Sequence, residues 1–440
     1  MLEGRIFYTF VFYSVNGMSC CDEITKRFFE HKRWEKALDV GVDKGISKAM
    51  LRDMAKPEVR ISLYRAIIQG GYTISPPRTA LIPKDSCGNY RMVYINQPAD
   101  RVILSIANDL LFDLTPDMIH PSCKSYISGI GCGKVVQEVS RRITGMPSTT
   151  GVVGWKSDLS KYFDSVAIEH IDRAFDVVEH RYGKSALIDM IRNYYHDDTY
   201  MDEHGEEAHK YMSLRQGCAV SSWLADVLLH DIDERLSGLQ GYYVRYCDDM
   251  LYVGPDYEQA MQVLIADLDK MGLRLNPKKI EMLSPERWFS FLGYSIKGQM
   301  ISLSSSRVKK FQQSIDLVTL KSRSMAHAIT RVNRFLYKGN GEFSWSTLVL
   351  PVMNVAQDLD TLNAYVMDAI RASKTGKRRI GGLGYDRAGN DGCIVRGRGR
   401  HVCANRAKTP QVLERYRSLT CMRKAMKTSR AAYDTIVRQM

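Results

Sequence analysis

Two kinds of hydrophobic pattern alternate along this chain. Between residues 22 and 70, and again after residue 301, apolar positions recur every three or four residues, as at Ile24 and Phe28 or at Phe311 and Ile315. That spacing predicts amphipathic helices. Between these regions, short β-rich runs alternate with further helical stretches. The pattern as a whole therefore predicts an α+β protein.

Turn residues and prolines place the individual elements. We expect a β-hairpin over residues 76–95 around a Gly88-Asn89 turn, a strand over 151–158 that ends on an acid, a second hairpin over 242–253, and a strand over 291–296. We expect helices at about 101–114, 135–143, 168–180 and 257–271, one that starts near Ser221, and a last basic helix at about 410–438.

The charge is concentrated at the end of the chain. The protein has 62 Lys and Arg against 49 Asp and Glu, a net charge of +13. From Lys374 to Met440 there are 17 basic and four acidic residues, so the preceding residues are neutral overall. This confinement favours contact with a nucleic acid backbone over a merely solvated surface. No window approaches 18 consecutive apolar residues, so no membrane-spanning helix is expected.

Ten cysteines show no CxxC pair and no disulfide-like spacing, which favours reduced thiols and a cytoplasmic protein. The loose trio Cys393, His401 and Cys403 lacks a fourth ligand, so it is a weak zinc candidate. The apolar run near the first residue lacks a small-residue cleavage site, which argues against a secretory signal. The start could be Met1 or Met18.

Three carboxylates stand at the ends of predicted strands. Asp158 ends one strand, and Asp248 with Asp249 joins the two arms of the second hairpin. If these strands are neighbours, the acids meet at one point and could bind two divalent cations about 3.5–4 Å apart for phosphoryl transfer. Hard oxygen ligands suit Mg²⁺ or Mn²⁺. Taken alone, an Asp pair in a turn is a weak signal, because such pairs are common.

The order of the motifs around these acids resembles the palm of reverse transcriptases. The motifs are Asp158-Leu-Ser-Lys-Tyr-Phe163-Asp, Arg215-Gln216-Gly217 with Ser221-Ser222, Tyr246-Cys247-Asp248-Asp249, Leu275-Asn276-Pro277-Lys278-Lys279 and Phe291-Leu292-Gly293-Tyr294. The upstream hairpin resembles the fingers motifs of the same family. The resemblance covers about residues 75–300 and continues more weakly to about 372.

This resemblance implies a right-hand polymerase fold with fingers, a ferredoxin-like palm and a helical thumb. The implied parts are an N-terminal extension (1–35), fingers with part of the palm (36–150), the palm (151–300), the thumb (301–373) and a basic C-terminal extension (374–440).

Carried over position by position, the resemblance implies that Asp158, Asp248 and Asp249 bind two Mg²⁺ ions, with Mn²⁺ as an alternative. Lys279 would be the general acid for the pyrophosphate leaving group. Phe163 would lie under the sugar and exclude a 2′-hydroxyl, although RNA-dependent RNA polymerases place an acid near the position of Asp164. The other nucleotide-binding positions are Lys84, Arg91, Leu159, Gln216 and Gly217, and the primer grip is Leu292, Gly293 and Tyr294. Ordinary surface or core roles stay open for Lys84, Arg91, Phe163, Lys279 and the primer grip.

Several branches of the reverse transcriptase family are disfavoured because their motifs are missing from this sequence. The sequence has neither the thumb element of retron enzymes nor the paired CxxC motifs of intron nucleases, and Ser221-Ser222 replaces the Ser-Gln of diversity-generating enzymes. What remains resembles the bacterial defence-associated reverse transcriptases of the unknown group, type 2 in particular. That group implies a structured non-coding RNA as template, dNTPs as substrates, a cDNA product, and protection against phage in the bacterial cytoplasm.

The basic extension is the candidate RNA-binding segment, through phosphate contacts and stacking by Tyr385 and Tyr416. Its proposed contact residues are Lys377, Arg378, Arg379, Arg396, Arg398 and Arg400. Two alternatives remain: a group II intron maturase-like enzyme, and a non-catalytic RNA-binding scaffold. The scaffold is disfavoured because clustered carboxylates would repel RNA unless metals offset their charge. The oligomeric state is not determined by the sequence.

Overall fold

The computed structural model describes residues 22–40, 46–83, 90–127, 129–146, 151–210, 213–322, 324–338, 345–376 and 378–379. The chain divides into two compact units. Unit 1 comprises the described residues up to Tyr126 with 155–252 and 256–280, and unit 2 comprises 127–154, 253–255 and the residues from Glu281 onward. The five-part division expected from the sequence stays a prediction. Among the described residues, no helix has the length and apolar character needed to cross a bilayer.

Unit 1 begins with a group of packed helices. They are α2 (Glu23–Phe28), α3 (His31–Val40), α4 (Lys48–Met54), α5 (Pro57–Ile68) and α6 (Pro98–Leu114). Asp22 caps α2 by accepting a hydrogen bond of 2.8 Å from the Thr25 N–H, and Pro98 is the first residue of α6, where its missing N–H costs nothing. Ile24 and Phe28 are fully buried, as their helical spacing predicts.

The first sheet of unit 1 has the strand order β2-β1-β4-β5. Its strands are β1 (Arg78–Pro83), β2 (Tyr90–Ile95), β4 (Thr199–Met201) and β5 (Glu207–His209). β1 and β2 form the predicted hairpin, with Ile82 opposite Arg91. Both arms are largely exposed at their tip end, so this hairpin presents side chains to solvent.

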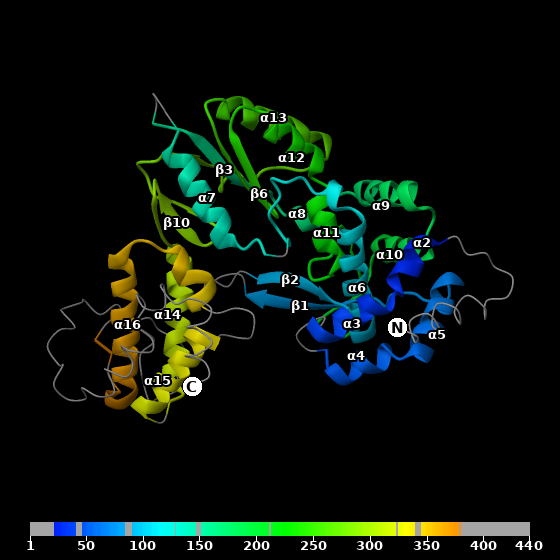
Figure 1. Cartoon of the computed structure of the whole chain (residues 1–440), viewed down its shortest axis with the longest axis horizontal. Helices are drawn as coiled ribbons and strands as arrows, with labels where there is room; N and C mark the ends of the chain where they lie inside the picture. Colours follow the sequence, from blue (N-terminus) through cyan, green and yellow to red (C-terminus); the bar gives the residue numbers. More distant parts are fainter. Residues whose placement is uncertain are drawn as a thin grey trace. The chain divides into compact units, whose positions relative to one another are not determined.

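The second sheet of unit 1 carries the predicted acids. β7 (Asp249–Val253) lies between β6 (Tyr242–Tyr246) and β3 (Gly154–Asp158). The other elements of unit 1 are α8 (Tyr162–Ser165), α9 (Ile168–Tyr182), α10 (Ala186–His196), α11 (Val220–Val227), α12 (His230–Ser237), α13 (Tyr257–Lys270) and the 3₁₀ helix η1 (Pro116–Met118). Helices α12 and α13 lie side by side (Figure 1). Trp155 of β3 and Trp223 of α11 are completely buried in the core that these elements share.

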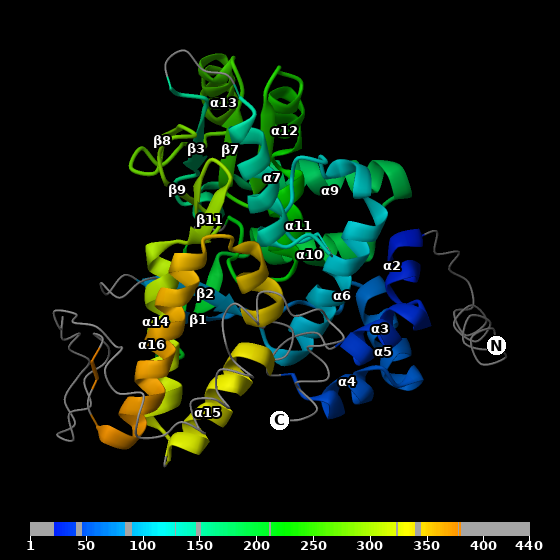
Figure 2. The same cartoon turned by 60° about the vertical axis from the view of Figure 1, so that its left-hand side comes forward.

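Unit 2 combines a small sheet with a helical bundle. The sheet has the strand order β11-β10-β9, with β9 (Phe289–Phe291), β10 (Tyr294–Lys297) and β11 (Met300–Leu303), and α7 (Cys132–Thr144) packs on β10 and β11. The short strand β8 (Glu281–Leu283) precedes this sheet in the sequence and is not part of it. The bundle helices α14 (Ser305–Leu320), α15 (Met325–Asn333) and α16 (Ala356–Thr375) pack against one another (Figure 2). Between α15 and α16 come the π-helical turns η2 (Arg334–Lys338) and η3 (Trp345–Val349) and the 3₁₀ turn η4 (Leu350–Val352).

The predicted strand over 291–296 is wrong. Leu292 and Gly293 have φ values of 49° and 80°, and they form a turn between the antiparallel strands β9 and β10. A two-residue hairpin turn of type I′ needs positive φ at both central positions, which glycine adopts freely and leucine rarely does. The apolar residues on both sides of this pair hid the turn in the sequence pattern.

Candidate active site

Backbone hydrogen bonds join the segments that carry the predicted catalytic acids. Asp158 ends β3 and is 6% exposed, and the N–H of the next residue, Leu159, donates to the Asp248 carbonyl at 3.3 Å. The Asp158 carbonyl in turn accepts from the Asn276 N–H at 2.8 Å. Three of the predicted motifs, although far apart in sequence, therefore meet at one end of the second sheet.

The turn that carries the acid pair has an unusual backbone. Cys247 has a φ of 58°, a left-handed conformation that is uncommon for a residue with a side chain. Asp248 lies in this turn, and Asp249 is the first residue of β7. The hairpin predicted from the sequence is confirmed, with both acids half-buried at its tip.

The three carboxylates repel one another. Burial raises the pKa of Asp248, and the neighbouring Asp158 charge adds to the rise. Burial also raises the pKa of Asp249 to about 6, with further contributions from the charges of Asp248 and Asp158. Lys279 partly offsets this repulsion, because its Nζ lies 2.5 Å from Asp158 Oδ2. An ammonium group thus already neutralises one of the acids.

The predicted two-metal site stays a prediction. Across the described ranges, no group of three His, Cys, Asp or Glu side chains is arranged to hold a metal ion. Lys279 engages a carboxylate oxygen of Asp158 that a metal would need. The donor set nevertheless fits a divalent cation, since three mutually repelling carboxylates supply hard oxygen ligands and lack full charge compensation.

Gly217 lies where two backbones approach closely. The Tyr94 N–H of β2 donates to the Gln216 carbonyl at 2.7 Å. Gly217 has a φ of 109°, and a Cβ there would lie 2.5 Å from the Tyr94 carbonyl oxygen. The close approach of β2 therefore requires a glycine at position 217, a contact that the sequence did not indicate.

The segment before α11 is held by buried polar contacts. Arg215 is 1% exposed, and its guanidinium lies 4.0 Å from the centre of the Tyr194 ring. Its carbonyl accepts a hydrogen bond of 2.9 Å from Ser221 Oγ. Ser221 therefore helps to fix the loop that carries Gln216 and Gly217.

Phe163 lies on α8, partly buried against the core, with its ring in edge contact with Tyr162. The next residue, Asp164, is about half exposed, and Lys210 Nζ lies 3.7 Å from its carboxylate. The Asp164 charge contributes to a raised pKa of Tyr94, whose burial is the main cause. The helix that carries Phe163 is therefore close to β2 and the Gln216 loop.

The remaining nucleotide-binding candidates differ in accessibility. Arg91 is exposed on β2, as a triphosphate contact requires. Leu159 is 2% exposed, so its side chain belongs to the core and only its backbone is placed for a contact. Lys84 lies outside the described residues.

The predicted primer grip lies in unit 2. Arg307 donates to the Leu292 carbonyl at 3.4 Å, and the Ser304 N–H donates to the Gly293 carbonyl at 3.1 Å. Tyr294 is 1% exposed, and the Arg307 guanidinium lies 4.7 Å from the centre of its ring. The Tyr294 side chain therefore belongs to the core, and the backbone of the turn is what this element presents.

Arg378 has an internal role in unit 2. Its side chain is 6% exposed and pairs with Asp316 at 2.7 Å and with Asp368 at 3.1 Å. The Arg379 N–H also donates to Asp368, at 3.0 Å. The predicted RNA contacts through these two arginines remain predictions, and for Arg378 they would require this pair to open. The other predicted tail residues (Lys377, Arg396, Arg398, Arg400, Tyr385, Tyr416, Cys393, His401 and Cys403) lie outside the described residues.

Sequence reasoning missed a group of buried polar residues behind the catalytic hairpin. Its centre is Arg245 in β6, which is completely buried and pairs with Asp233. The one signal in the sequence was a charged residue inside an otherwise apolar arm, two residues before Cys247. That signal indicates a buried ion pair but does not identify the partner.

Comparisons with known proteins bear on the activity. Residues 82–296 match the family model described as reverse transcriptase (RNA-dependent DNA polymerase), a family that uses divalent metal ions. No curated protein matches the sequence. Similar solved structures include apo telomerase from Candida tropicalis, with 12% identity, a TM-score of 0.43, and coverage of 80% of this chain and 75% of that chain. Telomerase from Candida albicans in complex with the TWJ fragment of telomeric RNA has 13% identity, a TM-score of 0.39, and coverage of 83% and 64%. Residues 82–296 thus match a reverse transcriptase domain, which supports the activity of an RNA-directed DNA polymerase, a nucleotidyltransferase. The mixture of helices and sheets in the described residues is consistent with the α+β right-hand polymerase fold.

Proposed function

We propose that this polymerase copies a dedicated structured non-coding RNA into cDNA in the bacterial cytoplasm, as part of a defence against phage. The proposal is supported by the segment Tyr246-Cys247-Asp248-Asp249, which resembles the catalytic segment of the defence-associated group, and by the excess of 17 basic over four acidic residues after Ser373. A segment of that charge favours a polyanionic partner such as RNA.

The observation that carries the catalytic assignment is the junction of β3 and the β6–β7 turn. Asp158, Asp248 and Asp249 would hold the metal ions, because the segments that carry them are hydrogen-bonded together there. Burial, and after it the neighbouring carboxylate charges, raises the pKa of Asp248 and of Asp249. When bound, two divalent cations, Mg²⁺ for preference, would activate the attacking 3′-oxygen and stabilise the charge that develops on the phosphates. The protein concentrates negative charge at this point. Lys279 would offset part of that charge until the metal ions and the triphosphate bind.

The neighbouring residues would select and orient the nucleotide. Lys279 would leave Asp158 and donate a proton to the pyrophosphate oxygen, which its half-exposed side chain allows. Phe163 would exclude a 2′-hydroxyl by steric contact. Gln216 and Gly217 would present backbone to the incoming base, and Arg91 would bind the triphosphate through its guanidinium.

One purification tests this function. The protein is isolated from a host that carries its native locus, the bound nucleic acid is sequenced, and dNTPs or NTPs are added with Mg²⁺. We expect one abundant small RNA and dNTP-dependent cDNA copied from it. Mixed RNA without synthesis from either nucleotide set would support the scaffold alternative, and dependence on the splicing of a host intron would support the maturase-like alternative.

The acid pair is tested in the same preparation. Asp248→Asn should abolish cDNA synthesis and phage protection while RNA binding is kept, because the amide cannot replace a charged metal ligand. Asp269→Asn is the matched control, since Asp269 is an exposed acid of α13. Protection retained by Asp248→Asn would refute the proposed catalytic role.

A further inference from the structure

A fixed turn is needed to hold Asp248 in place, and the turn contains a strained residue. Cys247, immediately before Asp248, adopts a φ of 58°. A left-handed non-glycine residue is unfavourable in itself and persists only where its surroundings hold it. The contacts around Cys247 therefore determine where the Asp248 carboxylate lies.

Both peptide groups that flank Cys247 are held by buried side chains. The Cys247 N–H donates to Ser125 Oγ at 2.9 Å. The Cys247 carbonyl accepts from Arg245 Nη1 at 3.2 Å. Because the Cys247 carbonyl and the Asp248 N–H belong to one planar peptide unit, fixing this unit also fixes the Asp248 Cα.

Ser125 is a link between the turn and an acid. It is completely buried, and besides accepting from Cys247 it donates to Asp226 Oδ1 at 2.5 Å. A serine hydroxyl has one proton to donate. In this arrangement the Ser125 hydroxyl donates that proton to Asp226, and its oxygen accepts the hydrogen bond from the Cys247 N–H. Asp226 lies on α11 and is also completely buried.

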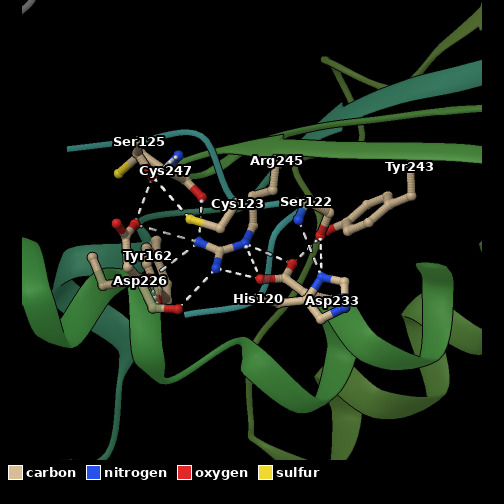
Figure 3. A network of polar contacts seen from close by, with 11 residues as sticks. His120, Ser122, Cys123, Ser125, Tyr162, Asp226, Asp233, Tyr243, Arg245 and Cys247 are labelled. Atoms are coloured by element: carbon tan, nitrogen blue, oxygen red, sulfur yellow. Dashed lines mark hydrogen bonds and ion pairs between the residues drawn. The ribbon is translucent and has the colours of Figure 1, made fainter. Parts of the chain in front are cut away.

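Arg245 completes the arrangement from the other side (Figure 3). Its guanidinium forms the 2.5 Å pair with Asp233 of α12, donates to the Asp226 carbonyl at 2.8 Å, and donates to the Ala225 carbonyl at 3.2 Å. A guanidinium group, which is planar and carries five N–H donors, can reach these acceptors and the Cys247 carbonyl at the same time.

The segment that carries Ser125 is itself attached to β6. The Arg245 N–H donates to the Ser122 carbonyl at 3.0 Å, and the Lys124 N–H donates to the Arg245 carbonyl at 2.8 Å. Cys123 and Arg245 form a parallel bridge. Ser125 is thus held beside the turn by backbone pairing as well as by its hydroxyl.

We propose that Ser125 is a positioning residue for polymerisation, which with Arg245 holds the Cys247 turn so that Asp248 points at the reacting phosphate. This inference rests on the proposed role of Asp248 as a metal ligand. The Ser125 hydroxyl is engaged by the Cys247 N–H and by Asp226, so it acts through the peptide unit before Cys247, while Arg245 acts through the peptide unit after it.

The test compares Ser125→Ala with Ser185→Ala. Ser185 is also buried in unit 1, at 1% exposure, and its hydroxyl contacts Thr25 Oγ1 at 3.2 Å. We expect Ser125→Ala to lower the single-turnover rate of dNTP addition about 10- to 100-fold, the range associated with displacement of a catalytic group by about 1 Å. We expect Mn²⁺, titrated calorimetrically into the protein with primer and template, to bind several-fold more weakly. Ser185→Ala should match the wild type in both measurements.

Ser125→Cys keeps a side chain of the same shape, slightly larger, with a weak donor and a weak acceptor. Its rate and its Mn²⁺ affinity should fall between those of the wild type and those of Ser125→Ala. It also decides the matter if circular dichroism shows that Ser125→Ala does not fold. Wild-type rate and Mn²⁺ affinity in a folded Ser125→Ala or Ser125→Cys protein would overturn the inference. Full activity in Asp248→Asn would instead overturn the proposed function itself, so the two failures can be told apart.

Discussion

Replacing Gly217 with alanine measures how closely the Gln216 loop must approach β2. The substitution has two costs, and the structure allows them to be separated. The first is conformational, because an L-residue at a φ of 109° is strained. The second is steric, because the new Cβ would lie 2.5 Å from the Tyr94 carbonyl oxygen, well inside van der Waals contact.

Gly205 supplies the control for the first cost. Its φ is 82°, and a Cβ there would meet nothing within 4 Å. Gly205→Ala should therefore lose only the conformational part, about 1–2 kcal/mol of stability. Gly217→Ala should lose in addition about 1–3 kcal/mol, the usual cost of forcing atoms into a filled space, because the obstructing atom belongs to a paired strand and cannot rotate away.

Urea unfolding of both variants gives the stability difference, and hydrogen exchange at the Tyr94 amide gives the local effect. That amide bonds to the Gln216 carbonyl, so its exchange should be faster in Gly217→Ala by about tenfold for each 1.4 kcal/mol of local destabilisation. The KM for dNTPs should rise as well, because Gln216 is displaced. If Gly217→Ala and Gly205→Ala lost the same stability, and hydrogen exchange at the Tyr94 amide were unchanged, the predicted steric contact between residue 217 and β2 would be refuted.

Three further predictions concern the active site. Phe163→Val should admit ribonucleotides, so primer extension with rNTPs should rise at least tenfold relative to dNTPs, whereas unchanged selectivity would assign Phe163 to packing alone. Asp249→Asn should be more stable than the wild type in EDTA at pH 7.5, by about 1–3 kcal/mol. The pKa of the Asp249 carboxyl is about 6 in the folded protein and 3.8 in the unfolded chain, so its ionisation destabilises the fold as the pH rises from 3.8 through 6. The advantage should vanish below pH 4, and a constant difference across pH would contradict it. Lys279→Met should lower the Mg²⁺ concentration for half-maximal rate, since the competing ammonium is gone from Asp158, and should also lower the maximal rate by tenfold or more if Lys279 is the general acid. A Mg²⁺ titration of single-turnover rates separates the two effects, and a higher Mg²⁺ requirement would show that Lys279 supports metal binding.

The strands and the turn that carry the predicted catalytic acids could be predicted from the sequence because their signal is local. Apolar arms on each side of Asp248 and Asp249 give a strand, a break and a strand, and Asp158 follows a similar apolar run. Such patterns depend on neighbouring residues, so they can be read without knowledge of the fold. The same holds for α6, which begins at Pro98 and was predicted to follow it.

The contacts that position these acids could not be predicted in this way. Lys279 meets Asp158 across 121 residues, and Arg378 meets Asp316 across 62. A lysine or arginine in a sequence does not indicate which acid it will pair with, because the partner is decided by tertiary packing. The Arg378 pair shows the difference most clearly, since a residue assigned to RNA by composition is buried against two acids, Asp316 of α14 and Asp368 of α16.

The hydrogen bonds by which Ser125 and Arg245 hold Cys247 also have a consequence for the order of folding. The β6–β7 hairpin joins residues that are close in sequence, and local hairpins form within microseconds. The hydrogen bond from Cys247 to Ser125 spans 122 residues, and the one from Ser125 to Asp226 spans 101. Contacts of such long range form slowly, because a long loop must close first. The strands that carry the acids can thus exist before their turn is fixed, and polymerase competence is acquired only when distant parts of unit 1 have come together.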